Sequence, residues 1–263
     1  MDPVEVIEGE GRVVLGQPHG GTEVPAAIRA RLNEVGQGLC DTDWHIARLY
    51  EGLLPDATVV RAGFHRYVVD ANRDPSGASL YPGQATTGLV PTTDFDGRPI
   101  WRDGQEPDEA EVARRRRAFH APYHAALAAQ LERVRARHGA VLFFDCHSIR
   151  SEVPRLFEGR LPTFNIGTAD GAACAPAVEA AVRDAVAALA EGPEDWVLNG
   201  RFKGGWCTRR YGEPARGLHA LQLELAQRAY MTESPPWDYD PARAEPTRAK
   251  LRRVLEAFAA SLL

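Results

Sequence analysis

The sequence predicts an α/β fold in three layers, with a mostly parallel or mixed central sheet and helices on both of its faces. Two observations support this prediction. Short runs of β-branched and other apolar residues alternate with longer segments whose apolar residues recur at helical spacing, which is typical of sheets covered by helices. The composition, with 44% hydrophobic and 25% charged residues, is that of an ordinary globular protein.

The expected strands are short apolar runs bounded by polar or turn-forming residues. They are residues 12–16, 58–61, 67–70, 140–145, 196–199 and 220–225. The expected helices have amphipathic spacing, and the first begins with Pro25, which a helix tolerates in its first turn. They are residues 25–35, 41–54, 106–138, 171–190 and 241–262. Pro122 should kink the third helix or split it in two, because proline lacks a backbone N–H.

The organisation of the chain indicates one domain. No internal repeat and no low-complexity linker divides its 263 residues, so we expect a single domain over residues 1–263. The longest loop-like stretch, residues 74–106, is rich in Pro, Gly, Thr and Asp. Because long loops in compact domains are often functional, we expect this loop to be a lid or wall near the functional site.

The charge balance excludes several classes of partner. A net charge of −5 and a pI of about 5.9 give no electrostatic attraction to nucleic acid or to an anionic membrane.

No apolar run approaches the roughly 20 residues that span a bilayer, and the acidic N-terminus does not resemble a signal peptide. Four scattered cysteines are typical of reduced thiols, so we expect a soluble cytoplasmic protein and leave its oligomeric state open.

Unusual polar residues gather where the expected strands end. In open α/β sheets, ligands bind outside the carboxyl ends of the strands, so polar groups at several strand ends can converge on one site. This convergence requires residues that lie far apart in the sequence to meet at one edge of the sheet. The residues are His19, Asn72, Arg73, Asp145, His147 and Glu224.

The first candidates for ligands are a histidine and an aspartate near the N-terminus. His19 is followed by two glycines, whose backbone lets a metal ion or substrate approach closely; the alternative is a solvent-facing histidine in a turn. Asp41 has the position of a helix N-cap, which leaves Asp43 as a spare oxygen ligand. The alternative is that both acids only stabilise the start of the helix through its dipole.

Two segments offer cations for an anionic ligand. Arg73 can grip a carboxylate through two parallel hydrogen bonds, with Asn72 as a further donor; the alternative is a salt bridge between Arg73 and Asp74. Residues 201–212 combine glycines with four cations, which indicates either an anion-binding loop or an exposed basic hairpin. The segment lacks the GK[ST] sequence, so it is not a P-loop.

The strongest single cluster ends the strand at residues 140–145. Side chains alternate along a strand, so Asp145 and His147 project to one face while Cys146 points into the core. His147 can bind a metal ion while Asp145 fixes its tautomer. Glu224 interrupts an apolar strand and is costly to bury alone, so it is either half of a buried ion pair or a catalytic carboxylate with a raised pKa.

Two features of the long helical segment are interpreted as structural. His120 and His124 have the i, i+4 spacing of a helical metal pair, but no acid lies between them and Pro122 interrupts the turn. The basic run at residues 114–117 has the pattern of a solvated helix face.

Eight motifs can be recognised along the chain: PHGGTEVP, DTDWHIARLY, YVVDANRDP, SLYPGQATTGL, FFDCHSIRS, LFEGRLPTFNIGTADGAACAP, GRFKGGW and HALQLELAQRAYM. Taken together, they strongly resemble the motifs of the N-formylglutamate amidohydrolase family from about residue 10 to about residue 235. The resemblance implies a zinc-exopeptidase-like (phosphorylase/hydrolase-like) fold. It also implies a metal-dependent hydrolase that cuts N-formyl-L-glutamate into formate and L-glutamate in histidine degradation.

A more distant resemblance links the chain to zinc carboxypeptidases. Residues 70–73 are similar to their substrate-carboxylate motif, His147 to their late histidine ligand, and Glu224 to their general base. Those enzymes carry an early HxxE motif, whereas here His19 is followed by Glu23, one residue further along. The wider amidohydrolase family resembles this chain at Asp43, so we rank Asp43 first and keep Glu23 as its rival.

These resemblances imply a role for each residue. One Zn²⁺ ion is held by His19, His147 and one carboxylate, the open three-ligand site of hydrolytic zinc enzymes. Glu224 is the general base. Arg73 and Asn72 bind one carboxylate of a small dicarboxylate substrate. The candidates for the other are Arg150, Lys203, Arg209 and Arg210.

Two alternative functions follow from the same residues. The first is a related metal-dependent amidase or carboxypeptidase that acts on another N-acyl amino acid or peptide. The second is a non-catalytic module that binds acidic amino acids, which requires no metal ion and no general base.

Overall fold

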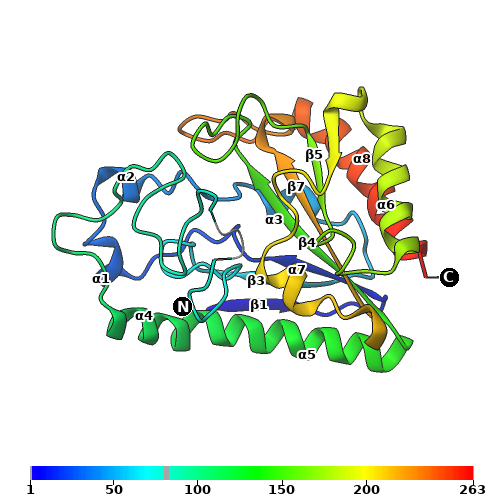
Figure 1. Ribbon diagram of the computed structural model, residues 1–263, viewed down its shortest axis with the longest axis horizontal. Coiled ribbons are helices and arrows are strands. Elements are labelled where there is room, and N and C mark those ends of the chain that lie inside the picture. The colour runs from blue at the N-terminus through cyan, green and yellow to red at the C-terminus, as the bar shows by residue number, and fades with distance from the viewer. Residues whose placement is uncertain (1, 80–82, 263) are drawn as a thin grey trace.

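A mixed seven-stranded sheet forms the centre of the computed structural model, which describes residues 2–79 and 83–262 (Figure 1). The order of the strands across the sheet is β1-β3-β2-β4-β7-β5-β6. β2, β3, β4 and β7 are parallel, whereas β1 pairs with β3 and β5 pairs with β7 in antiparallel fashion. The strands are β1 (Val4–Ile7), β2 (Val13–Gln17), β3 (Thr58–Ala62), β4 (Val141–Ile149), β5 (Phe164–Gly167), β6 (Trp196–Leu198) and β7 (Leu218–Ala226).

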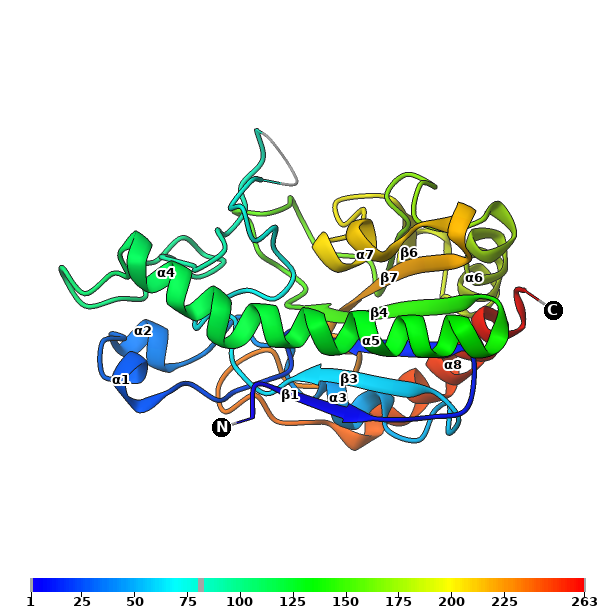
Figure 2. The ribbon, with the colours of Figure 1, turned by 90° about the horizontal axis from the view of Figure 1, so that it is seen from below.

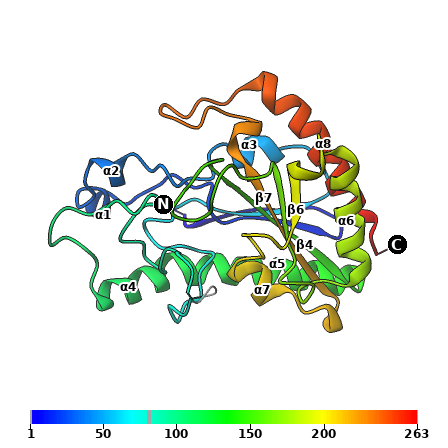
Figure 3. The ribbon, with the colours of Figure 1, turned by 45° about the horizontal axis from the view of Figure 1, so that its top comes forward.

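Helices cover both faces of this sheet, which confirms the predicted three-layer α/β fold (Figures 2 and 3). α5 and α7 pack on one face, and α3, α6 and α8 pack on the other. The helices are α1 (Ala26–Arg29), α2 (Glu34–Gln37), α3 (Ile46–Tyr50), α4 (Glu109–Arg115), α5 (Ala121–His138), α6 (Pro176–Leu189), α7 (Trp206–Tyr211) and α8 (Pro241–Ala260). Within the described residues, no helix is long and apolar enough to cross a membrane.

The central strands β4 and β7 are buried along their whole length because both of their faces are covered. Alternate side chains therefore enter different cores: Phe143 packs with the α5 side, and Phe144 packs with the α3 and α8 side. Residues of β4 and β7 pair in parallel register, with His147 opposite Glu224. The same alternation thus places these two polar side chains on one face of the sheet.

Two segments differ from the expected elements. Residues 67–70 form no strand in the described chain; they are buried and irregular, because helix side chains rather than a neighbouring strand bind their carbonyl groups. The helix predicted at residues 106–138 begins at Glu109 and continues across Pro122, because a π-helical turn at Arg116–His120 precedes the proline and accommodates its missing N–H. The predicted helices at residues 25–35 and 41–54 are limited to the short α1, α2 and α3.

The sequence prediction also missed three short elements: β1, β5 and α7. β1 and β5 have four residues each, and α7 has six. Segments of this length give too few residues to establish a period. Their conformation is stabilised by the neighbouring strands and by the core rather than by local preference.

Phe144 is expected to be one of the strongest contributors to stability. Its ring is fully buried and contacts the rings of Tyr50 and Phe258, at centroid distances of 6.2 and 5.2 Å. Phe144→Ala should lower the free energy of unfolding by about 3–5 kcal/mol, as measured by chemical denaturation, because it leaves a cavity between sheet and helices. Phe157→Ala, at a partly buried position, is the control. Equal losses for the two variants would contradict this account of the core.

Candidate metal centre and active site

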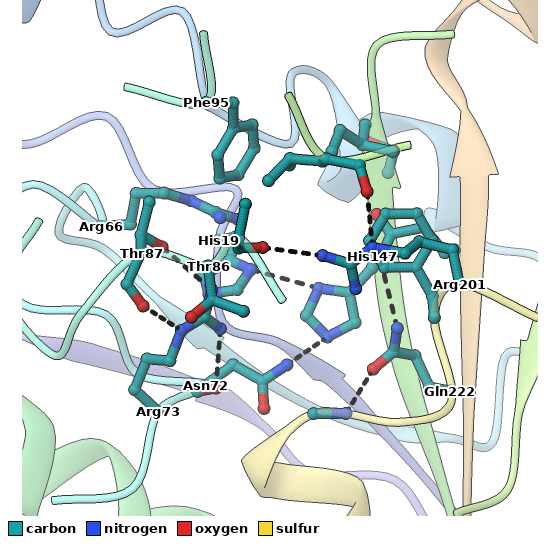
Figure 4. A pocket seen from close by; sticks show the side chains of 17 residues that line it. His19, Arg66, Asn72, Arg73, Thr86, Thr87, Phe95, His147, Arg201 and Gln222 are labelled. Carbon is teal, nitrogen blue, oxygen red and sulfur yellow. Dashed lines mark hydrogen bonds between the residues drawn. The ribbon is translucent and has the colours of Figure 1, made fainter. Parts of the chain in front are cut away.

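A pocket opens at the carboxyl ends of the central strands, where the sequence predicted that polar residues would converge (Figure 4). It encloses about 80 Å³. Residues from β4, β7 and the loops after β2 and β3 line it together with residues from the 74–106 loop. The polar side chains of its wall include His19, Arg66, Asn72, Arg73, Thr86, Thr87, His147, Ser148, Arg201, Gln222 and Glu224.

Two histidines and an aspartate form a buried cluster at the base of this pocket. One ligand atom from each of His19, Asp43 and His147 lies within 4.8 Å of the others. The Nδ1 atoms of the two histidines are 3.2 Å apart. Oδ2 of Asp43 lies 3.2 Å from Nδ1 of His147 and 3.9 Å from Nδ1 of His19. The side chains come from the end of β2, the loop before α3 and the end of β4.

The local backbone brings the first two of these residues together. The backbone N–H of Asp43 donates to the carbonyl of His19 at 3.1 Å, which joins the two loops. Gly21 follows in the same loop, and a Cβ at this position would lie 2.5 Å from the backbone of Gly63. Glycine is therefore required for the His19 loop to pack against the chain that leaves β3.

Each metal-facing group is oriented by a second contact. Nε2 of His19 donates to Oδ1 of Asp70 at 2.7 Å. Nε2 of His147 lies within ion-pair distance, 3.1 Å, of Oδ1 of Asp145, a buried atom that accepts no hydrogen bond from the described residues. With Nε2–H of His19 directed at Asp70, the Nδ1 lone pair of His19 faces Nδ1 of His147. Nδ1 of His147 bonds to Asp43 and would lose its hydrogen on binding a metal ion, as in the carboxylate–histidine–metal arrangement.

The carboxylate of Asp43 is held from two sides. Its Oδ1 accepts from Nη2 of Arg66 at 2.9 Å, and its Oδ2 accepts from the backbone N–H of Ser148 at 3.0 Å. Burial opposes ionisation, but the bond with His147 and the charge of Arg66 hold the pKa of Asp43 below its ordinary value. Asp43 is thus an anion beside two imidazoles.

The donor set fits a zinc ion. Two nitrogens bound at 2.0–2.1 Å to one tetrahedral Zn²⁺ lie about 3.3 Å apart, close to the separation of the two Nδ1 atoms. Burial and the neighbouring Arg66 lower the pKa of His19 to about 4, so its imidazole is neutral, as a metal ligand must be. Burial also lowers the pKa of His147, but Asp145 and Asp43 together raise it well above its ordinary value. A bound cation is an alternative to protonated His147 as the positively charged partner of the carboxylates of Asp145 and Asp43.

Glu224 lies beside this cluster in the wall of the pocket. It is the register partner of His147, and its Oε2 accepts from Nε2 of Gln222 at 3.2 Å. Burial raises the pKa of Glu224 to about 7 against the opposing effect of His147. A carboxylate with a pKa near neutrality can both accept and return a proton.

Arg73 and Asn72 line the same pocket as Glu224. Figure 4 shows the side chains of Arg73 and Asn72 next to each other. Arg73 donates to the carbonyl and hydroxyl of Thr87 and to the carbonyl of Asn72, which fixes its guanidinium at the wall. The amide of Asn72 is used within the protein: Oδ1 accepts from the N–H of Cys207, and Nδ2 lies 3.1 Å from Nε2 of His147.

The four cations expected to bind a second carboxylate lie outside the pocket wall. Arg150 pairs with Asp96, Lys203 with Asp170 and Arg210 with Glu213, while Arg209 donates to the carbonyl of Gly204. The arginines that line the pocket besides Arg73 are Arg66 and Arg201. Figure 4 shows Arg66 and Arg73 on one side of the histidines and Arg201 on the other.

The sequence prediction missed Arg66, Arg201 and Asp70 as site residues. Arg201 belongs to the basic segment 201–212, but composition does not reveal which of its cations faces inward. Arg66 immediately precedes the run that resembles a strand, and Asp70 ends that run. Both are buried charges, and a charge that flanks an apolar run is the signal that could have identified them.

Glu23, the rival ligand, is not part of the cluster. Its backbone pairs with the chain beside Phe64 in an isolated bridge, and its side chain is exposed. The 74–106 loop contributes Thr86, Thr87 and Phe95 to the wall. Residues 80–82 of this loop, which belong to the motif SLYPGQATTGL, lie outside the described residues.

Comparison with known proteins gives a consistent result. Residues 11–231 match the family described as N-formylglutamate amidohydrolase. N-formylglutamate deformylase of Pseudomonas aeruginosa is 49% identical over 95% of this chain and 94% of its own length. The enzyme of the same name from Pseudomonas putida is 44% identical over 96% of this chain and 94% of its own. The crystal structure of N-formylglutamate amidohydrolase from Ralstonia eutropha superposes with a TM-score of 0.79 and 26% identity, covering 98% of both chains.

Proposed function

Because the chain belongs to the N-formylglutamate amidohydrolase family, and is therefore a hydrolase of an amide bond, we propose that it is a zinc-dependent enzyme that converts N-formyl-L-glutamate to formate and L-glutamate. The observation that carries this proposal is the juxtaposition of a two-histidine, one-aspartate cluster and a buried glutamate in one arginine-lined pocket. The family resemblance further suggests a place in histidine degradation, and four unpaired cysteines suggest a cytoplasmic enzyme.

In this mechanism His19, Asp43 and His147 hold the metal ion, and their partners Asp70 and Asp145 keep the two imidazoles in the ligating tautomer. When bound, zinc supplies the Lewis acidity that polarises a carbonyl group and makes water more acidic. Arg66 keeps Asp43 ionised and oriented.

Glu224 performs the proton transfers. It accepts a proton from water as the water oxygen bonds to the formyl carbon, and it then delivers that proton to the amide nitrogen as the C–N bond breaks. Cleavage gives formic acid and the free amine of glutamate, and a proton transfer between them gives formate and the ammonium form, so atoms and charge balance without any other reactant. Its pKa of about 7 suits both halves of this exchange.

The two carboxylates of the substrate need cations that face the pocket. We assign one to Arg73, as the family resemblance implies, and the other to Arg201 in place of the four cations outside the wall. A planar guanidinium binds a carboxylate through two parallel hydrogen bonds, which gives both affinity and orientation. The substrate would then span the pocket between the two arginines.

Arg73→Ala should raise KM for N-formylglutamate by about 10- to 100-fold, because a charge-assisted pair contributes about 1.5–3 kcal/mol to binding. Steady-state formate release measures this effect. Arg210→Ala removes an exposed arginine outside the pocket and should leave KM unchanged. Equal KM values for the two variants would move Arg73 to a purely structural role.

The overall proposal is tested by measuring formate released from N-formylglutamate by zinc-loaded protein, with peptides and other N-acyl amino acids as competing substrates. Formate release that is fastest with N-formylglutamate supports the proposal. Faster cleavage of peptides or of bulkier acyl groups would favour the related amidase or carboxypeptidase. Binding without turnover would indicate the non-catalytic module.

A further inference from the structure

The segment at residues 67–75 carries Asp70, Asn72 and Arg73 into the active site but belongs to no strand in the described chain. A buried segment without ladder partners must find other donors for its carbonyl groups, because an unpaired buried carbonyl costs free energy. Here the donors come from side chains of one continuous helical segment, α4 to α5.

Four side chains of this helical segment donate to five carbonyl groups of residues 67–75. Nη1 of Arg115 donates to Tyr67 and Val68, and Nη1 of Arg116 donates to Pro75. Between them, Nε2 of His124 donates to Ala71 at 2.8 Å and Nε2 of His120 donates to Arg73 at 3.0 Å. Arg115 and Arg116 belong to the basic run at residues 114–117, for which the sequence pattern predicted a solvated helix face. Arg115 is instead buried.

The π-helical turn brings the two histidines into line. Arg116–His120 forms this turn directly before α5, and the rings of His120 and His124 contact each other with centroids 4.2 Å apart and their planes tilted by 35°. π-Helical turns occur frequently at functional sites because the extra residue re-aims side chains. The Nε2–H groups of His120 and His124 therefore face the carbonyls of Arg73 and Ala71, which lie two residues apart in the same loop.

Those alternate carbonyls flank the residues that orient the metal ligands. The peptide groups of Ala71 and Arg73 bracket Asn72, and Asp70 directly precedes them. Asp70 binds Nε2 of His19, and the Asn72 amide lies 3.1 Å from Nε2 of His147. A shift of this backbone would move the carboxylate that accepts from His19 and, at the same time, the side chain that packs against His147.

Both histidines act as neutral donors. A carbonyl only accepts, so each Nε2 carries a hydrogen. Burial lowers the pKa of His120, and it lowers the pKa of His124 to about 4. Nδ1 of His124 is then an acceptor for the hydroxyl of Tyr211, 2.9 Å away on α7.

We propose that His120 and His124 are positioning residues that clamp the backbone of residues 70–73, and through it orient His19 and His147 toward the metal and Arg73 toward the substrate. Neither histidine lines the pocket. The substrate readout of this proposal rests on the proposed function, whereas the metal readout rests only on the histidine–aspartate cluster.

The test compares asparagine with glutamine at each position. The glutamine amide reaches about as far as Nε2 of histidine, whereas the asparagine amide reaches only as far as Nδ1. His120→Asn and His124→Asn should weaken zinc affinity by about 10- to 100-fold, the usual effect of losing a group that orients a ligand. They should also raise KM, while His120→Gln and His124→Gln stay within about threefold of the wild type.

Zinc affinity is measured by competition with a chromogenic chelator in the absence of substrate, and KM by formate release. His138→Asn is the matched control, because His138 also donates through Nε2 from α5 to a carbonyl, that of Glu10, far from the site. The proposal is overturned if the asparagine and glutamine variants have equal zinc affinity and equal KM, whatever their thermal stability. A wild-type protein that binds zinc without releasing formate contradicts the proposed function alone, since the zinc contrast still tests the clamp.

Discussion

Replacing Glu224 with glutamine is expected to lower kcat for formate release by roughly 10²–10⁴-fold, the usual loss for a general base. Glutamine preserves the shape of the side chain and the contact with Gln222 but cannot accept a proton. Because Glu224 lies beside the metal cluster and is not one of its three ligands, the variant should retain the zinc content of the wild type. Parallel measurements of turnover and bound zinc by elemental analysis check both statements.

The outcome separates three roles for this carboxylate. Lost activity with full zinc supports a general base, whereas lost zinc would show that Glu224 is a ligand. Full activity would remove Glu224 from the mechanism. Glu23→Gln is the control, since it removes an exposed glutamate that the HxxE comparison offered as a ligand, and it should change neither zinc nor turnover.

The pKa of Glu224 also predicts the pH dependence of catalysis. A general base must be deprotonated, and burial raises the pKa of this group to about 7. kcat/KM should therefore rise with pH through the neutral range and level off above it. A bound cation favours the ionised form, so zinc should shift the rising limb toward lower pH.

His147→Ala should deplete the protein of zinc and abolish most of its activity. The substitution removes one of the three proposed ligands and leaves the carboxylates of Asp43 and Asp145 without their imidazole partner. A metal ion supplies several kcal/mol of charge stabilisation, so its loss should lower kcat/KM by about 10³-fold or more. Zinc per chain, measured after dialysis against a weak chelator, should fall well below that of the wild type.

His138→Ala provides the comparison, because this partly exposed histidine lies at the far end of α5. It should keep both zinc and activity. Full zinc occupancy in His147→Ala would remove His147 from the ligand set. Full activity after complete removal of metal from the wild type would contradict the metal-dependent mechanism as a whole.

Local pattern was informative wherever a residue's environment follows from its neighbours in the chain. The alternation along residues 141–149 places Asp145 and His147 on one face, and the parallel register with β7 places Glu224 opposite His147. The rule that ligands bind at the carboxyl ends of strands indicated the edge at which these residues meet. The α/β class follows from the same periodicities.

Pattern failed where a segment is shaped by partners far away in the chain. Residues 67–70 have the composition of a strand, yet Arg115 rather than a neighbouring strand binds the carbonyl groups of Tyr67 and Val68. His124 and His120 bind the carbonyl groups of the two residues 71 and 73 just beyond them. The basic run at residues 114–117 has the pattern of a solvated helix face, yet Arg115 in this run is buried, where it binds two of these carbonyl groups. Neither segment reveals the other, because about 45 residues separate their contacts.

From the sequence alone came the α/β class, the family to which the motifs belong, and the histidines and glutamate on which the proposed chemistry rests. These depend on residue type and on short-range periodicity, which are properties of the chain itself. Only the tertiary structure showed that Asp43, and not Glu23, joins the two histidines in the cluster. It also showed that Arg66 and Arg201 are the arginines that line the pocket together with Arg73. Those choices depend on which loop packs against which strand end, and the free energy that selects that packing is distributed over contacts between distant residues.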